Sequence, residues 1–360
     1  MADQSHRTTE PLRIIDSLRG VEPLRIVGAP GSPYSRKLRA VLRCRRIPYA
    51  WMHQGSPESR GLPAPRIALL PQLVLPGADG ALEAAVDSTP LIHRLEKLYP
   101  DRSVVPPDPV VAFVDALLED YADEWLTKAM FHFRWAFAPD VARAAAILPR
   151  WFRTNMPESQ ARALGETFAE RQIGRLAVVG SNETTAPVIE ESYRRLLRLL
   201  DAHLTASRFV MGGRPGVSDF GLYGQLTQLV GFDPTPAAIA LETAPRVVAW
   251  VDVVEDLSGL EPAQSDWITR DGVADTLRAL LAEVGRVYVP FLLANAEALA
   301  RGAERVECAV DGRRWVQRPF PYQGKCLQWL REGYAALVQH DQRAVDGLLK
   351  GTGCERLFAR

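Results

Sequence analysis

The sequence predicts an α/β domain at the N-terminal end, followed by an all-α domain and a mostly helical C-terminal extension. Three observations predict this fold class. Strand and helix patterns alternate over residues 23–100, a proline-rich segment follows at 101–110, and most later segments repeat apolar residues with the helical period. At 360 residues, the chain exceeds the roughly 100 to 200 residues of a single domain.

The first predicted unit is a strand that leads directly into a helix. The run LRIVGAP, from Leu24, is apolar and β-branched and ends in glycine and proline, which favour a turn. Ser32 is a good N-cap and Pro33 suits the first helical position. A helix is therefore expected over about residues 33–46.

The rest of this domain reads as three strands and a closing helix. IPYAWMH predicts a strand, LLPQLVLPG and GALEAAV predict two more joined by a turn at residues 77–80, and STPLIHRLEKLYP predicts a helix ending near Pro100. The order β-α-β followed by β-β-α is the thioredoxin-like arrangement, in which antiparallel strands extend a parallel unit. A polar tail is expected over residues 1–22.

Residues 111–260 are expected to form a helical bundle, since their apolar residues recur at helical spacing. The extension at 261–360 is apolar enough to fold against that bundle. In it we expect a helix kinked at Pro290, a hairpin over residues 305–318 that turns at Asp311-Gly312, and a further helix. The predicted bundle helices are VAFVDALLEDYADEWLTKAMFHFRWAF, RALGETFAERQIGRL, VIEESYRRLLRLLDAHL, DFGLYGQLTQLV and PRVVAWVDVVEDL.

Composition argues against several classes of function. Basic and acidic residues number 43 each, so no overall charge favours nucleic acid or an anionic membrane. No apolar run is long enough for a membrane span and no signal peptide is visible, so we expect a cytoplasmic protein. The histidines and cysteines lack metal-site spacing, which predicts no metal and free thiols.

One candidate site begins the first helix. Ser32, Pro33, Tyr34 and Ser35 stand where thioredoxin-like proteins carry C-P-x-C. A hydroxyl there cannot exchange disulfides, but together with the helix N-terminus it can stabilise the thiolate of a bound ligand. The alternative is that Ser32 only caps the helix.

Two further candidate motifs lie in the same predicted thioredoxin-like domain. Pro71 precedes a strand, where a cis proline would leave the neighbouring backbone free to pair with an extended ligand; the alternative is an ordinary trans proline. Asp87 and Ser88 begin the closing helix, where a carboxylate, a hydroxyl and free backbone N–H groups can hold an amino-acid zwitterion. The alternative is a simple N-cap.

In this order, these motifs make residues 24–260 resemble the soluble glutathione transferase (GST) superfamily. The resemblance rests on GSPYSRKLRAVL, LLPQLVL, VDSTPLIHRLEKLYP and RPGVSDFGLYGQL. It implies a glutathione cosubstrate, and the S-P-Y form is similar to the serine-type plant enzymes. Ser32 is then the catalytic candidate, with Ser35 as the fallback. The implied glutathione-binding residues are Tyr34, Leu70, the cis Pro71, Asp87 and Ser88.

The sequence departs from the family pattern in three places. The stretch HQGSPESRGLPAPRIA lacks the family's Lys-rich segment, which puts contacts to the glycyl carboxylate of glutathione in doubt. Gly216 stands where family members carry a Ser or Thr cap, although Asp219 of the same capping motif is present; we expect Asp219 to be structural. The extension resembles that of long bacterial GST-like proteins.

A second-substrate pocket is expected in the helical domain. Trp125, Lys128, His132 and Trp135 fall on one helical face at steps of three and four, where they could bind an apolar electrophile. The alternative for this face is core packing or a subunit interface.

The resemblance therefore implies a glutathione transferase that activates the glutathione thiolate for attack on a small hydrophobic electrophile. Two alternatives stay open: a non-catalytic GST-like protein that binds a ligand or a protein partner, and a glutathione-dependent isomerase or lyase. A homodimer is implied by the resemblance, with no nucleic acid or membrane partner.

Overall fold

In the computed structural model, which describes residues 23–77 and 80–358, the N-terminal domain is a mixed four-stranded sheet with the order β2-β1-β3-β4. Strands β1 and β2 are parallel, whereas β3 is antiparallel to both β1 and β4. This is the predicted thioredoxin-like arrangement. Its elements are β1 (Leu24–Gly28), α2 (Pro33–Cys44), β2 (Tyr49–His53), β3 (Gln72–Pro76), β4 (Leu82–Val86) and α3 (Ser88–Leu98).

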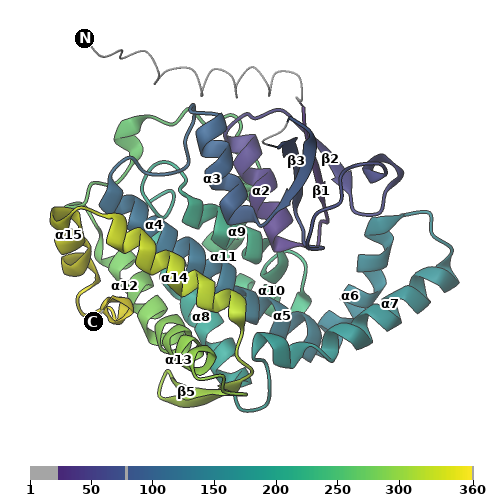
Figure 1. Cartoon of the computed structure of the whole chain (residues 1–360). Coiled ribbons are helices and arrows are strands. Elements are labelled where there is room, and N and C mark those ends of the chain that lie inside the picture. The colour runs from purple at the N-terminus through teal and green to yellow at the C-terminus, as the bar shows by residue number, and fades with distance from the viewer. Residues whose placement is uncertain (1–22, 78–79, 359–360) are drawn as a thin grey trace, which may run out of the picture.

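The expected tail over residues 1–22 and the middle of the predicted 77–80 turn lie outside the described residues. Within the sheet, Ile26 of β1 is fully buried and stands in register with Trp51 of β2 and Leu73 of β3. Helix α2 contacts α3 and also α9 of the helical domain (Figure 1). The N-terminus of α2 is thereby held at the boundary between the two domains.

The second domain is all-α, as predicted. Helices α6 and α7 pack as a pair that projects beside the sheet (Figure 1). Helices α6 and α10 were not predicted. Both contain proline, including Pro149 inside α6, and proline argues against a helix interior. The helices are α4 (Pro109–Tyr121), α5 (Thr127–Ala136), α6 (Ala138–Phe152), α7 (Glu158–Ile173), α8 (Ala186–His203), α9 (Val217–Leu229), α10 (Pro234–Thr243) and α11 (Pro245–Val254).

The extension folds against the bundle and shares its core, which contains the fully buried Phe291 and Trp315. A π-helical turn at Val284–Tyr288 precedes Pro290, the residue where a kink was predicted. The predicted hairpin turn has positive φ at Asp311 and Gly312, as a type I′ turn requires. The extension comprises α12 (Asp275–Glu283), α13 (Val289–Ala300), β5 (Val306–Val310), β6 (Arg313–Gln317), α14 (Pro321–Ala336) and the unpredicted α15 (Gln339–Leu349).

Helix α9 receives its cap from another helix. The Asp115 carboxylate of α4 accepts hydrogen bonds from the backbone N–H groups of Val217 (2.9 Å) and Ser218 (3.1 Å). Asp219 Oδ2 accepts from the N–H of Gly216 at 2.9 Å, which confirms the structural role predicted for Asp219. A Cβ atom on residue 216 would lie 2.5 Å from Asp115 Oδ2, so glycine leaves room for the capping carboxylate.

The four cysteines are free thiols, as predicted. None of the helices in residues 23–77 and 80–358 combines the length and the hydropathy that a membrane crossing needs.

Candidate active site

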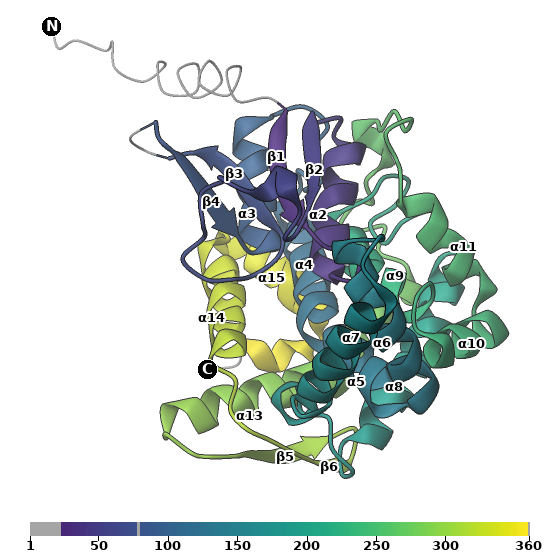
Figure 2. The same ribbon diagram turned by 90° about the vertical axis from the view of Figure 1, so that its right-hand side faces the viewer.

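Two cavities lie near the edge of the sheet where β1 ends and α2 begins. In Figure 2 the sheet lies above, with α14 below it on one side and α6 and α7 below it on the other. The first cavity, of about 360 Å³, lies on the α6–α7 side. The second, of about 460 Å³, lies on the α14 side. Leu70 borders both cavities and is the one lining residue that they share among the described residues.

Ser32 borders the first cavity at the start of α2. Its Oγ accepts a hydrogen bond from the backbone N–H of Ser35 at 3.2 Å, so Ser32 caps the helix. Because this oxygen acts as an acceptor in the cap, its hydroxyl hydrogen can still be donated to a group in the cavity. Capping and thiolate stabilisation are therefore compatible roles for this side chain.

Ser35 has a different environment. It is fully buried, and its Oγ accepts from the backbone N–H of Ala29 at 3.4 Å. It is not among the residues that border either cavity. The geometry therefore favours Ser32 over Ser35 as the hydroxyl that faces a ligand.

The predicted glutathione-binding residues gather around the second cavity. Tyr34, Leu70, Asp87 and Ser88 all border it. The Leu70–Pro71 peptide bond is cis, although Pro71 itself is not a lining residue. The hydroxyl of Tyr34 donates to the backbone carbonyl of Asp123 at 2.9 Å, which fixes this wall of the cavity. Burial, together with Glu124 and Asp123, raises the pKa of Tyr34 well above its usual value.

Asp87 and Ser88 present polar atoms at the start of α3. Asp87 has φ of 78°, a left-handed conformation, and its Oδ2 accepts a hydrogen bond from the Tyr322 hydroxyl at 2.5 Å. Ser88 is 2% exposed, and among the described residues its Oγ has no hydrogen-bond partner. A buried hydroxyl without a partner is uncommon and indicates a missing polar group. An anionic or zwitterionic ligand end would supply that group.

Asp123, which lines the second cavity, belongs to a buried cluster of charged side chains. Lys37 is fully buried and forms ion pairs with Glu119, at 2.6 Å, and with Asp123, and it donates to Thr89 Oγ1 at 2.9 Å. Burial raises the pKa of Asp123 to about 6, against the lowering effect of Lys37. The contacts from Lys37 and Thr89 to Oδ2 stabilise the ionised form of this carboxyl group.

Glu124 and Lys128 border the same cavity one helical turn apart. Burial, and then Asp120 and Asp123, raise the pKa of Glu124 to about 8, and burial lowers the pKa of Lys128 to about 7. The Lys128 ammonium donates to the carbonyl of Val179 at 3.1 Å, and no carboxylate of the described residues lies within 4.0 Å of it. Such shifts are common among groups that line a functional cleft.

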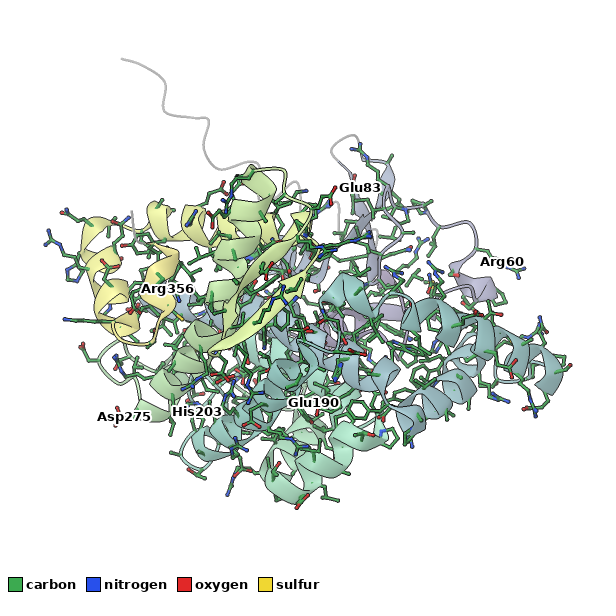
Figure 3. All side chains as sticks on the ribbon, turned by 90° about the horizontal axis from the view of Figure 1, so that it is seen from below. Arg60, Glu83, Glu190, His203, Asp275 and Arg356 are labelled. Carbon is green, nitrogen blue, oxygen red and sulfur yellow. The ribbon has the colours of Figure 1, made fainter. Side chains whose placement is uncertain are left out.

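The expected aromatic face does not form one pocket wall. Trp135 borders the first cavity and Lys128 the second, whereas Trp125 and His132 border neither. Trp125 is 1% exposed and packs against Trp315, with ring centroids 5.1 Å apart and ring planes tilted by 40°. His132 Nδ1 lies 2.8 Å from Ser181 Oγ, and its Nε2 lies 3.4 Å from Glu190, which Figure 3 labels. These two side chains belong to the core, the alternative stated for this face.

Several residues of the site were not predicted. The first cavity is walled mainly by aromatic and aliphatic side chains of α5, α6 and α7. Arg134 joins them, with its guanidinium bonded to Asp233 and Gln228. The second cavity is closed by residues of the extension. These residues are Phe131, Leu148, Trp151 and Phe168 in the first cavity, and Phe320, Tyr322 and Gln323 in the second.

The sequence shows only that aromatic residues cluster near certain helix ends. Aromatic residues flank the ends of α6 and the start of α14, but nothing in their spacing shows which distant segment they face. Among the described residues, no group of three or more His, Cys, Asp or Glu side chains is arranged to hold a metal ion.

Family comparisons match two parts of the chain in order. The family model of the glutathione S-transferase N-terminal domain matches residues 26–103, and that of the glutathione S-transferase C-terminal domain matches residues 161–252. Neither match reaches the extension. No curated protein matches the chain.

Solved structures of similar proteins include three glutathione S-transferases. The Rhodospirillum rubrum F11 protein is 17% identical, with 72% of this chain and 91% of that chain covered and a TM-score of 0.38. The Methylobacterium radiotolerans JCM 2831 protein, a complex with glutathione sulfonate, is 19% identical, with 67% and 98% covered and a TM-score of 0.34. The Tau class enzyme of mango, Mangifera indica, is 17% identical, with 71% and 95% covered and a TM-score of 0.38.

Proposed function

The chain belongs to the glutathione S-transferase superfamily, and from this premise we propose that it binds glutathione and activates its thiol for attack on a small hydrophobic electrophile. The observation that carries the proposal is the pairing of the two cavities. Ser32 borders one, Asp87 and Ser88 border the other, and Leu70 borders both. One extended ligand can thus reach a zwitterion site and a hydroxyl at a helix N-terminus together.

The γ-glutamyl end of glutathione suits the second cavity. Its carboxylate would accept a hydrogen bond from the unpartnered Ser88 Oγ and from the N-terminal N–H groups of α3. Its ammonium group would face carboxylates such as Asp87. The cysteinyl part would then lie beside Leu70, which borders both cavities and whose backbone could pair with it.

The thiol would enter the first cavity beside Ser32. A thiol has an ordinary pKa of about 8.5, so only a small part of it is ionised at neutral pH. A hydrogen bond donated by the Ser32 hydroxyl, together with the positive end of the α2 dipole, stabilises the thiolate and lowers that pKa. The larger thiolate population is the chemical contribution of this residue.

The second substrate would occupy the rest of the first cavity. Its walls include Phe131, Trp135, Trp151 and Phe168, so it favours an apolar molecule. An electrophile bound there lies against the same wall as Ser32, which places it near the thiolate. Conjugation, glutathione-dependent isomerisation and lyase chemistry could all start from this arrangement.

One observation supports a second candidate, a GST-like protein that binds a ligand without turning it over. The Tyr322 hydroxyl already bonds to Asp87, so a ligand ammonium must compete for that carboxylate.

We also propose a homodimer located in the cytoplasm, on the family resemblance alone. Size-exclusion chromatography with light scattering would measure the oligomeric state.

Two measurements test the proposed function. Calorimetric titration with glutathione tests binding, and a screen of small aromatic and alkyl electrophiles with glutathione tests turnover. Binding with turnover supports the transferase, and binding without turnover supports the ligand-binding protein. The absence of binding at glutathione concentrations up to about 10 mM would mean a binding free energy weaker than about 3 kcal/mol and would contradict both.

A further inference from the structure

Two acceptor oxygens from distant parts of the chain lie without partners beside the second cavity. Asp123, in the π-helical turn that joins α4 to α5 (Ala122–Leu126), is 7% exposed, and Gln323, in the first turn of α14, is 1% exposed. Both residues border the cavity. Among the described residues, Asp123 Oδ1 and Gln323 Oε1 have no hydrogen-bond partner.

The other atoms of both side chains are fixed by neighbours. Asp123 Oδ2 accepts from Lys37 Nζ and from the Thr89 hydroxyl, so Oδ1 is the free end of that carboxylate. Gln323 Nε2 donates to the backbone carbonyl of Glu124 at 3.1 Å, which leaves Oε1 as the free end of the amide. Helix α14 runs alongside α4 (Figure 1) and holds the two residues on the same cavity.

The local chemistry selects a donor with positive charge. Both free atoms are acceptors, and a buried acceptor without a partner is unfavourable. The cavity is also lined by the Asp87 carboxylate, against a single lining cation, Lys128, among its described residues. A primary ammonium group carries three N–H donors and one positive charge, which meets both requirements. A π-helical turn is also a common place for functional side chains.

We propose that Asp123 and Gln323 form a subsite for a primary ammonium group, so that the C-terminal extension takes part directly in ligand recognition. The subsite rests on the proposed function in so far as the ammonium belongs to the γ-glutamyl group of glutathione. It adds two acceptors to Asp87, which the proposed function places against the same ammonium group, and one of them comes from α14, which lies outside both matched family domains.

The first test compares glutathione with its des-amino analogue, in which hydrogen replaces the ammonium group. Calorimetry on the full chain should give an affinity about tenfold or more lower for the analogue, because a charged hydrogen bond is lost. Gln323→Leu should reduce that discrimination to about threefold or less, and Gln323→Glu, which keeps an acceptor oxygen, should preserve it. The control Gln328→Leu, at an exposed position of α14, should behave as wild type.

Each outcome decides the proposal. Equal binding of glutathione and the des-amino analogue by the wild type overturns the subsite, together with any contact of Asp87 to the ammonium, and leaves the proposed binding and activation of glutathione intact. Unchanged discrimination in a folded Gln323→Leu protein overturns the role of the extension. Since the ligand comparison needs no variant, a misfolded Gln323→Leu protein does not affect the first result.

If glutathione does not bind at all, the proposed function fails and a second probe tests the subsite alone. Propylammonium chloride and 1-propanol, at equal concentration and ionic strength, are compared by thermal denaturation. A higher Tm with the amine only, absent in Gln323→Leu and retained in Gln328→Leu, supports the subsite. The same Tm with both probes overturns it.

Discussion

The hydroxyl of Tyr322 donates a 2.5 Å hydrogen bond to Oδ2 of Asp87, across 235 positions of the sequence. Asp87 begins α3 of the thioredoxin-like domain, and Tyr322 lies in the first turn of α14 of the extension. Burial and this hydrogen bond to Asp87 raise the pKa of Tyr322, so the phenol remains a donor at any ordinary pH. The extension therefore contacts the carboxylate that the proposed function assigns to the ligand ammonium.

Tyr322→Phe should tighten glutathione binding. The variant removes the donor that competes with the ligand ammonium for Asp87 while it keeps the aromatic ring in the cavity wall. We expect the affinity to rise about three- to tenfold, the range that corresponds to one net hydrogen bond of about 1 kcal/mol. Calorimetric titration measures it. A weaker affinity would show instead that Tyr322 positions Asp87 for the ligand.

Ser32→Ala should abolish most turnover and leave glutathione binding nearly unchanged. The thiolate loses its hydroxyl donor, and removing one such donor typically lowers kcat about 10²- to 10³-fold. Stability should fall by about 1 kcal/mol, because Ser32 also caps α2. Ser35→Ala is the matched control, with a smaller effect on kcat. The account is wrong if Ser32→Ala turns over every accepted electrophile at the wild-type rate.

Glu124→Gln should flatten the pH dependence of stability. The pKa of Glu124 is raised to about 8 in the folded protein, from an ordinary 4.5. The folded protein therefore holds the proton of Glu124 more tightly than the unfolded chain does. The resulting stabilisation of the fold is complete below pH 4.5 and is lost as the pH rises through 8. Relative to the variant, the wild type should become less stable between pH 5 and 9 in urea unfolding. Exposed Glu304→Gln should show no such trend.

Gly216→Ala should destabilise the junction of α4 and α9. The added Cβ would lie 2.5 Å from Asp115 Oδ2 and displace the carboxylate that caps α9. We expect the free energy of unfolding to fall by about 1–3 kcal/mol. Gly259→Ala, where a Cβ meets nothing within 4 Å, is the control. Equal stability of the two variants would remove the steric explanation for glycine at this position.

Local signals were enough to predict much of the fold. The cap at Ser32, the proline at the start of α2 and the Asp311-Gly312 turn each depend on a few adjacent residues, and the structure places them as predicted. Helix α6 was missed because it carries Pro149 in its interior, where proline argues against a helix, although Trp151 near its end borders the first cavity.

The residues of the predicted aromatic face are divided between the two cavities and the core, and for Trp125 the reason is geometric. Trp125 lies in the π-helical turn at Ala122–Leu126, which has a different number of residues per turn from the α-helix that carries His132 and Trp135. Helical spacing counted through that turn therefore assigns Trp125 to the wrong face. The contact of Tyr322 with Asp87 could not be predicted, because no local pattern shows which surface a distant helix will cover.

The most direct test of the central claim is calorimetric titration of glutathione into the wild type and into Ser88→Ala. Since Ser88 Oγ has no partner among the described residues, removing it should leave the Tm unchanged or slightly higher. The account predicts micromolar to low-millimolar binding by the wild type, weakened about tenfold in Ser88→Ala. No binding by the wild type, or equal affinities for the two proteins, would contradict it.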